Sequence, residues 1–86
     1  MTVTKQHVAE KIAEYLHHRV TLAELVDWAE KAMLDGEFEE KDAAAISAVV
    51  ARLGVADVRA FGLTWADCEE LLARLGFSAR IEISAA

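Results

Sequence analysis

The chain has 86 residues, of which 55% are hydrophobic and 28% charged, with a net charge of −6 and one cysteine. This length predicts a single compact domain over residues 1–86, which buries only about 60–65% of the surface that its unfolded chain exposes. It contains no apolar run near the roughly 18–20 residues that cross a bilayer and no signal-peptide core, and one cysteine cannot form an internal disulfide. We therefore expect a cytoplasmic protein without a membrane partner.

The first predicted helix follows Thr4, which is placed to act as its N-cap. Its apolar side chains recur at the spacing of one helical face, namely Val8, Ile12, Tyr15 and Leu16. The helix is expected to end near residues 17–19, where two histidines and an arginine suit the negative end of a helix.

The second predicted helix begins after Thr21, because Glu24 three residues later completes a capping box. Trp28 lies at the margin of its apolar face. Gly36 is expected to end the helix in the left-handed conformation. The residues expected on the buried face are Leu22, Leu25, Val26, Ala29 and Met33.

A third helix is predicted from about Glu39 or Asp42 to Leu53, where Gly54 stops it. Its inward positions are Ile46, Val49, Val50 and Leu53. A short acidic turn containing a glycine joins it to the second helix, which predicts a hairpin of two helices.

The fourth predicted helix starts at Thr64, with Asp67 completing a capping box. Gly76 is expected to end it in a Schellman motif in which Phe77 folds back onto Leu72. Its apolar stripe is Trp65, Cys68, Leu72 and Leu75.

Two remaining segments lack the helical period. Residues 78–84 alternate Ile81 and Ile83 with charged residues, which predicts a short C-terminal strand. Residues 55–61 fit either a second short strand or a helical turn. The predicted fold is therefore mainly α, with four helices in a single domain and a short C-terminal β-strand.

The negative charge is concentrated in residues 24–42, which carry eight acids and two bases, whereas the other residues have seven of each. Such a zone repels nucleic acid and anionic lipid and attracts a basic surface. A simpler interpretation is a well-solvated turn, because acids favour helix starts and keep small proteins soluble. Both interpretations stay open at this point.

The sequence predicts no catalytic residue, no metal ligand and no cofactor. Acids at positions 35, 37 and 39 resemble the start of a calcium loop, but Glu40 and Ile46 occupy the positions of its glycine and its bidentate acid. His7 and His18 share a helix face, with Glu14 between them, and solvent exposure explains them more simply than a metal. Cys68 lies on an apolar stripe and is interpreted as a core residue. We therefore expect no enzyme.

The stretches T-L-A-E-L-V-D-W and D-G-E-F-E-E-K-D, within residues 21–53, resemble the helical region of the colicin-type nuclease immunity proteins. That resemblance implies an acidic helical protein that blocks a basic nuclease. The tyrosine pair and the Asp-Ser-Pro turn of that family have no counterpart after residue 53. The stretch D-G-E-F-E-E-K-D-A-A-A-I also resembles the helix junction of TerB-like tellurite-resistance domains. We assign the chain to neither family.

The sequence thus predicts a small acidic interaction module, with an immunity- or antitoxin-like neutraliser of a basic protein as its concrete form. Phe38 or Trp28 would be its aromatic anchor, although Phe38 could instead be the first core contact of the third helix. The predicted partner-binding residues are Trp28, Asp35, Glu37, Phe38, Glu39, Glu40 and Asp42. The alternative is self-association as a homodimer paired through the C-terminal strand, with the acidic zone only solubilising.

Overall fold

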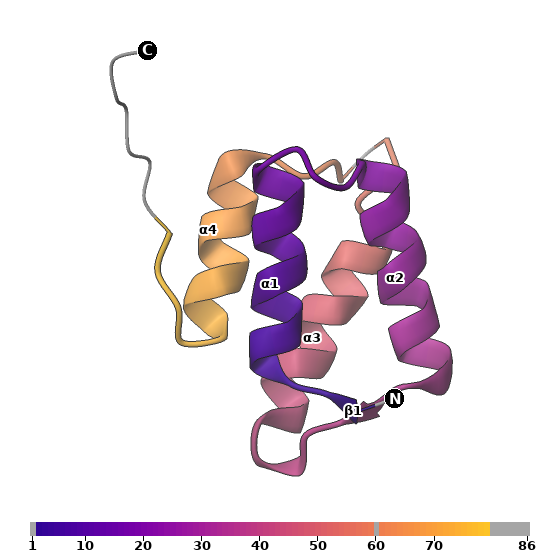
Figure 1. Cartoon of the computed structure of the whole chain (residues 1–86), viewed down its shortest axis with the longest axis vertical. Helices are drawn as coiled ribbons and strands as arrows, with labels where there is room; N and C mark the ends of the chain where they lie inside the picture. The colour runs from indigo at the N-terminus through magenta and orange to yellow at the C-terminus, as the bar shows by residue number, and fades with distance from the viewer. Residues whose placement is uncertain (1, 60, 80–86) are drawn as a thin grey trace.

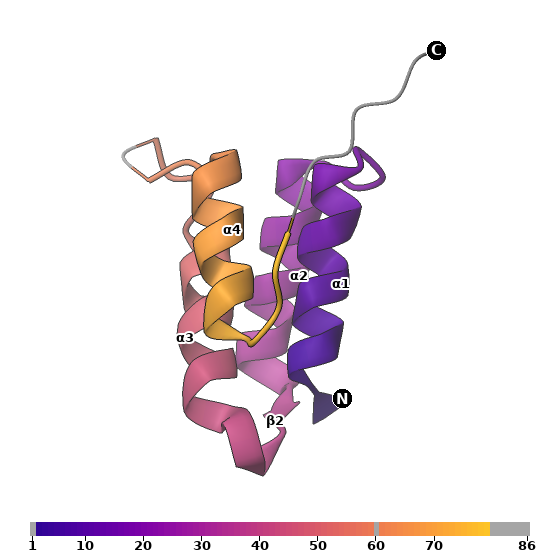
Figure 2. The ribbon, with the colours of Figure 1, turned by 90° about the vertical axis from the view of Figure 1, so that its left-hand side faces the viewer.

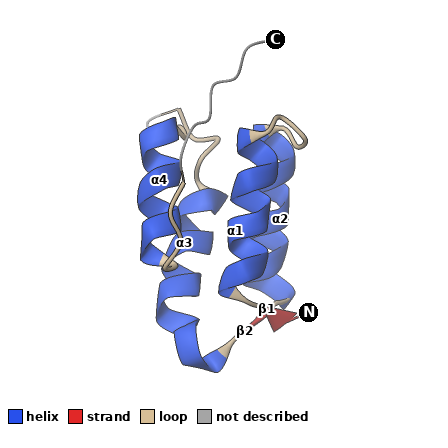
Figure 3. Ribbon diagram, turned by 60° about the vertical axis from the view of Figure 1, so that its left-hand side comes forward, coloured by secondary structure: helices blue, strands red, loops and turns tan. Residues whose placement is uncertain are grey.

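The computed structural model describes residues 2–59 and 61–79, and its main elements are four helices around one core (Figure 1). The helices are α1 (Lys5–Leu16), α2 (Leu22–Asp35), α3 (Ala43–Gly54) and α4 (Trp65–Arg74). The smaller elements are β1 (Thr2–Val3), β2 (Glu37–Phe38) and one turn of 3-10 helix, η1 (Glu40–Asp42). The mainly α prediction is confirmed, and the short strands form only a small part of the fold (Figure 3).

The predicted starts of α1 and α2 are confirmed by their capping hydrogen bonds. The Thr4 hydroxyl accepts a hydrogen bond from the backbone N–H of His7 at 3.1 Å. At the start of α2, the Thr21 hydroxyl accepts from the Glu24 N–H at 3.1 Å, and the Glu24 carboxylate accepts from the Thr21 N–H at 3.0 Å. These bonds satisfy N–H groups that a helix start leaves without partners.

The structure adds a pair of short parallel strands that the sequence analysis did not expect. Strand β1 pairs with β2 in the register Thr2 to Glu37 and Val3 to Phe38. The Glu39 N–H extends the pairing by donating to the Val3 carbonyl at 3.0 Å. The start of the chain is thereby tied to the connection between α2 and α3, at the lower end of the view in Figure 2.

Gly36 is required by close packing, and the prediction of a left-handed conformation there is wrong. Its backbone is extended, with φ −82° and ψ 147°, and its N–H donates to the Ala32 carbonyl at 2.9 Å. A Cβ atom at this position would overlap the Ala32 carbonyl oxygen and lie 2.9 Å from Val3 Cγ2. Only glycine therefore lets β2 leave α2 so close to β1.

The core contains apolar residues from all four helices. On α2 the buried positions are Leu25, Val26, Ala29 and Ala32, whereas Met33, which we expected inside, is 53% exposed. Met33 lies on the same side of α2 as Val26 and Ala29, seven and four residues before it, so what distinguishes Met33 is its place in the last turn of the helix. On α3 the predicted inward residues Ile46, Val49, Val50 and Leu53 are all buried.

The segment between α3 and α4 forms successive turns in its described residues, so of the two alternatives for residues 55–61 the helical turn is correct. The Val58 N–H donates to the Val55 carbonyl at 3.0 Å, and the Phe61 N–H donates to the Val58 carbonyl at 2.8 Å. Of the predicted strand at 78–84, residues 78 and 79 belong to no strand. Residues 80–84, with Ile81 and Ile83, lie outside the described residues.

Helix α4 ends in the predicted Schellman motif. Gly76 has a φ of +87°, its N–H donates to the Ala73 carbonyl at 3.0 Å, and the Phe77 N–H donates to the Leu72 carbonyl at 2.9 Å. Helix α1 ends with the same hydrogen-bond pattern, but His18 takes the left-handed position with a φ of +59°. A side chain at this position costs conformational energy that glycine avoids.

Candidate interaction surface

The predicted acidic residues lie where α2 ends, β2 passes and α3 begins. Asp35, Glu37 and Glu40 are exposed, whereas Glu39 and Asp42 are half-buried. Asp42 approaches Lys5 Nζ at 4.0 Å, so it also connects η1 to the start of α1. The other four acids form no ion pair with any described residue. Their charges are therefore free to act on another molecule.

Two of these five acids lie at or just beyond the electrostatically unfavourable end of a helix. Asp35 is the last residue of α2, Glu37 follows two residues later, and the last turn of α2 contains no basic residue. A helix carries partial negative charge at its C-terminus, so acids there are destabilising. By contrast, Glu40 and Asp42 precede α3, where acids are stabilising. The preference of acids for helix starts therefore explains only Glu40 and Asp42.

The two aromatic residues predicted as anchors are half-buried and pack against the core. Phe38 belongs to β2, not to the third helix, and Lys11 Nζ lies 6.0 Å from the centre of the Trp28 ring. The large apolar side chains exposed beside the acids are Leu34, at 83%, and Met33, at 53%. Leu34 was not among the predicted binding residues, although its position on the opposite side of α2 from the buried Leu25 indicates an exposed side chain.

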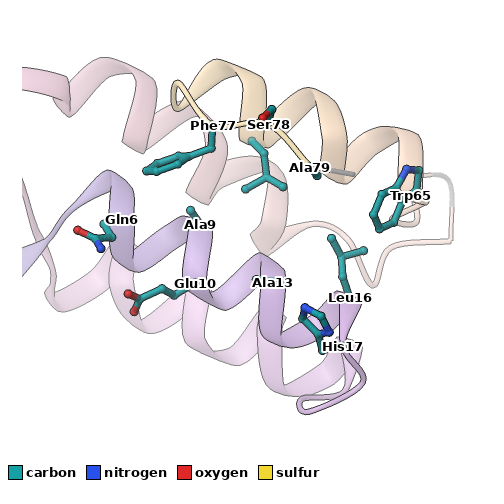
Figure 4. Close-up of a pocket in the computed structure, with 11 residues that line it drawn as sticks. Gln6, Ala9, Glu10, Ala13, Leu16, His17, Trp65, Phe77, Ser78 and Ala79 are labelled. Atoms are coloured by element: carbon teal, nitrogen blue, oxygen red, sulfur yellow. The ribbon is translucent and has the colours of Figure 1, made fainter. Parts of the chain in front are cut away.

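A groove of about 690 Å³ lies between α1, α4 and the residues that follow α4 (Figure 4). Helix α1 contributes Gln6, Ala9, Glu10, Ala13, Leu16 and His17. The opposite wall consists of Trp65, Leu72, Phe77, Ser78 and Ala79. A neighbouring hollow of about 420 Å³ shares Leu16 and Trp65 with it. None of the predicted partner-binding residues is among the described residues that line this groove. The groove was not predicted, because no local pattern in the sequence shows that α1 and α4 lie side by side.

Cys68 has no feature of a reactive or metal-binding thiol. Cys68 is buried and free, and burial, with a smaller contribution from the charge of Asp67, raises the pKa of its thiol to about 11. A thiol that stays protonated at neutral pH is a poor nucleophile and a poor metal ligand. Among the residues that the structure describes, no three histidine, cysteine or acidic side chains are grouped as a metal site would need.

Arg52 joins the connection between α3 and α4 to the start of α4. Its Nη2 donates to the Gly62 carbonyl at 3.1 Å and lies 3.5 Å from the Asp67 carboxylate, and its guanidinium is 5.6 Å from the centre of the Phe61 ring. Hydrogen bonds from the Thr64 backbone and hydroxyl, together with the charge of Arg52, lower the pKa of Asp67. We interpret this cluster as a structural clamp.

Comparisons with protein-family models, with curated proteins and with solved structures find no match to this chain. The resemblances within residues 21–53 therefore rest on those residues alone. Within the described ranges, no helix is both long enough and apolar enough to cross a membrane.

Proposed function

We propose that this chain is a small interaction module that binds a basic protein partner through its acidic end, which we define as Leu34, Asp35, Glu37, Glu39 and Glu40. The observation that carries the proposal is an exposed leucine beside acids that have no ion pair with any described residue. Asp35 is the last residue of α2, where an acid is electrostatically unfavourable. A solubilising role would not need an acid there.

In this mechanism the acids attract a basic surface and orient it before contact, which raises the association rate and makes binding sensitive to salt. Leu34 is then buried against an apolar part of the partner. Complete burial of a leucine side chain contributes about 1.5–3 kcal/mol, so Leu34 serves as the anchor. An immunity- or antitoxin-like neutraliser in the cytoplasm is the concrete form of the proposal, and it has no catalytic role of its own.

Affinity capture from native cell extract at low and at high salt tests the proposal, with proteins identified by mass spectrometry. The test variant replaces Glu37 and Glu40 by serine, and the matched control replaces Asp57 and Glu70 by serine. All four acids are exposed, so both variants lose the same charge. A third variant, Leu34→Ser, removes the apolar anchor.

We expect wild type and the Asp57/Glu70 control to retain a basic protein at low salt. The Glu37/Glu40 variant should lose it, and Leu34→Ser should bind it more weakly. Equal retention by all variants would refute the proposal. Capture of only further copies of the chain, at both salts, would favour the homodimer instead.

A further inference from the structure

The groove between α1 and α4 has a shape and a lining that suit a binding site separate from the acidic end. Its floor on α1 includes the small residues Ala9 and Ala13, one helical turn apart. Phe77 lies toward one end and Trp65 at the other (Figure 4). These aromatic side chains are 37% and 36% exposed, so substantial apolar surface remains in contact with water.

The described lining of the groove on α4, from Trp65 to Leu72, extends over about two turns of that helix. Trp65 and Leu72 are seven residues apart on α4, which corresponds to about 10 Å along the helix axis. A helix that presents apolar side chains at positions i, i+4 and i+7 places them over the same length. Ala9 and Ala13 leave room for such a helix to approach the α1 backbone closely, at the roughly 8–10 Å between axes that is typical of packed helices.

The charges around the groove favour a cationic occupant. Glu10 lines it, is exposed and forms no ion pair with a described residue, and no lysine or arginine is among the described residues that line it. Glu69 lies between Trp65 and Leu72 on the same side of α4, and it is also exposed and unpaired among the described residues. The chain as a whole carries a charge of −6.

We propose that this groove binds a cationic amphipathic helix of a partner protein. Apolar side chains of that helix lie between Trp65 and Phe77, and its lysine or arginine side chains lie toward Glu10 and Glu69. This is a second docking site on different elements from the acidic end, and it does not depend on the function proposed above.

A synthetic peptide tests the proposal directly. The probe is a helical peptide of about four turns, roughly 14–15 residues, with leucines at i, i+4 and i+7 and lysines beside them. A matched probe has glutamates in place of the lysines. The protein carries Trp28→Phe, so that Trp65 is the one remaining tryptophan of the two in the chain. Its fluorescence then reports occupation of the groove.

Ala13→Arg places a long cationic side chain in the groove, and the matched control Ala48→Arg makes the same change at an exposed position in the middle of α3. We expect Ala13→Arg to weaken lysine-peptide binding at least about tenfold and Ala48→Arg to change it less than about twofold. Glu10→Lys should weaken binding in the same direction. The glutamate peptide should bind at least about tenfold more weakly to the unsubstituted groove at low salt.

Equal affinities of Ala13→Arg and Ala48→Arg, or of the two peptides, would overturn the proposal. If Ala13→Arg does not fold, as judged by circular dichroism, Phe77→Ser replaces it, because Phe77 lies outside the helices. The Glu37/Glu40 variant separates the two sites, since it should retain full peptide binding. Loss of binding from that variant alone would place the peptide at the acidic end and would also overturn the groove.

Discussion

Replacing Gly36 by alanine should destabilise the protein, even though the backbone at this position is open to any residue. Its φ of −82° and ψ of 147° are ordinary extended values. Alanine restricts the unfolded chain and would by itself stabilise by about 0.4–1 kcal/mol. The added Cβ, however, would overlap the Ala32 carbonyl oxygen and lie 2.9 Å from Val3 Cγ2.

Relief of this overlap requires β2 to move away from the end of α2. That movement strains the 2.9 Å hydrogen bond from the Gly36 N–H to the Ala32 carbonyl and the pairing of β1 with β2. Overpacking costs about 1–3 kcal/mol and a weakened hydrogen bond about 0.5–1.5 kcal/mol. After subtraction of the unfolded-state gain, we expect the free energy of unfolding to fall by about 1–3 kcal/mol.

Gly54→Ala is the matched control. Gly54 is the last residue of α3, and the nearest atom to an added Cβ, Met33 Sδ, would be 3.7 Å away, an ordinary contact. Because alanine is the better helix former, this variant should be stabilised by up to about 1 kcal/mol. Urea unfolding followed by circular dichroism measures both changes, and each kcal/mol shifts the Tm by about 4–8 °C. A Gly36→Ala protein as stable as wild type would refute the close packing of β1, β2 and α2.

Four further predictions concern stability and reactivity. His18→Gly should raise the free energy of unfolding in urea by about 0.5–1 kcal/mol, because glycine adopts the left-handed backbone conformation at lower cost. A lower free energy of unfolding would show that contacts of the imidazole stabilise the fold by more than this conformational cost. Asp35→Asn should stabilise by about 0.3–1 kcal/mol by removing an acid from the end of α2, and an unchanged midpoint would contradict that electrostatic account. The lowered pKa of Asp67 stabilises the folded protein at pH values above 3.8, the ordinary pKa of this carboxyl group. This stabilisation is lost as the pH falls through the pKa of the folded state. The acid unfolding profile of Asp67→Asn should therefore be flatter below that pH, and a profile parallel to wild type would contradict the cap. Because the pKa of Cys68 is raised from 9.0 to about 11, the free energy of unfolding should fall as the pH rises through that interval. The thiol should also react far more slowly with a thiol reagent in the folded protein than in urea, and rapid labelling of the folded chain would contradict its burial.

The sequence predicted those features whose interacting groups lie within a few residues of each other. The capping boxes at Thr21 and Thr64 and the turn at Gly76 are of this kind, because each is completed by hydrogen bonds within one or two helical turns. The periodic apolar positions of α3 were likewise correct, since the helix buries a single face. The concentration of acids in residues 24–42 is also evident from the sequence.

The tertiary structure decided what depends on partners distant in the chain. Gly36 packs against Val3, which is more than thirty residues away in the sequence, so the neighbouring residues do not show why glycine is required at this position. The packing of the end of α2 in the bundle places Ala32 inside and leaves Met33 and Leu34 exposed, although all three are compatible with a helix. The groove between Ala13 and Trp65 exists only because α1 and α4 pack side by side. Local hydrogen bonding and periodicity therefore set the helices, whereas packing between distant segments determined which surfaces remain available for binding.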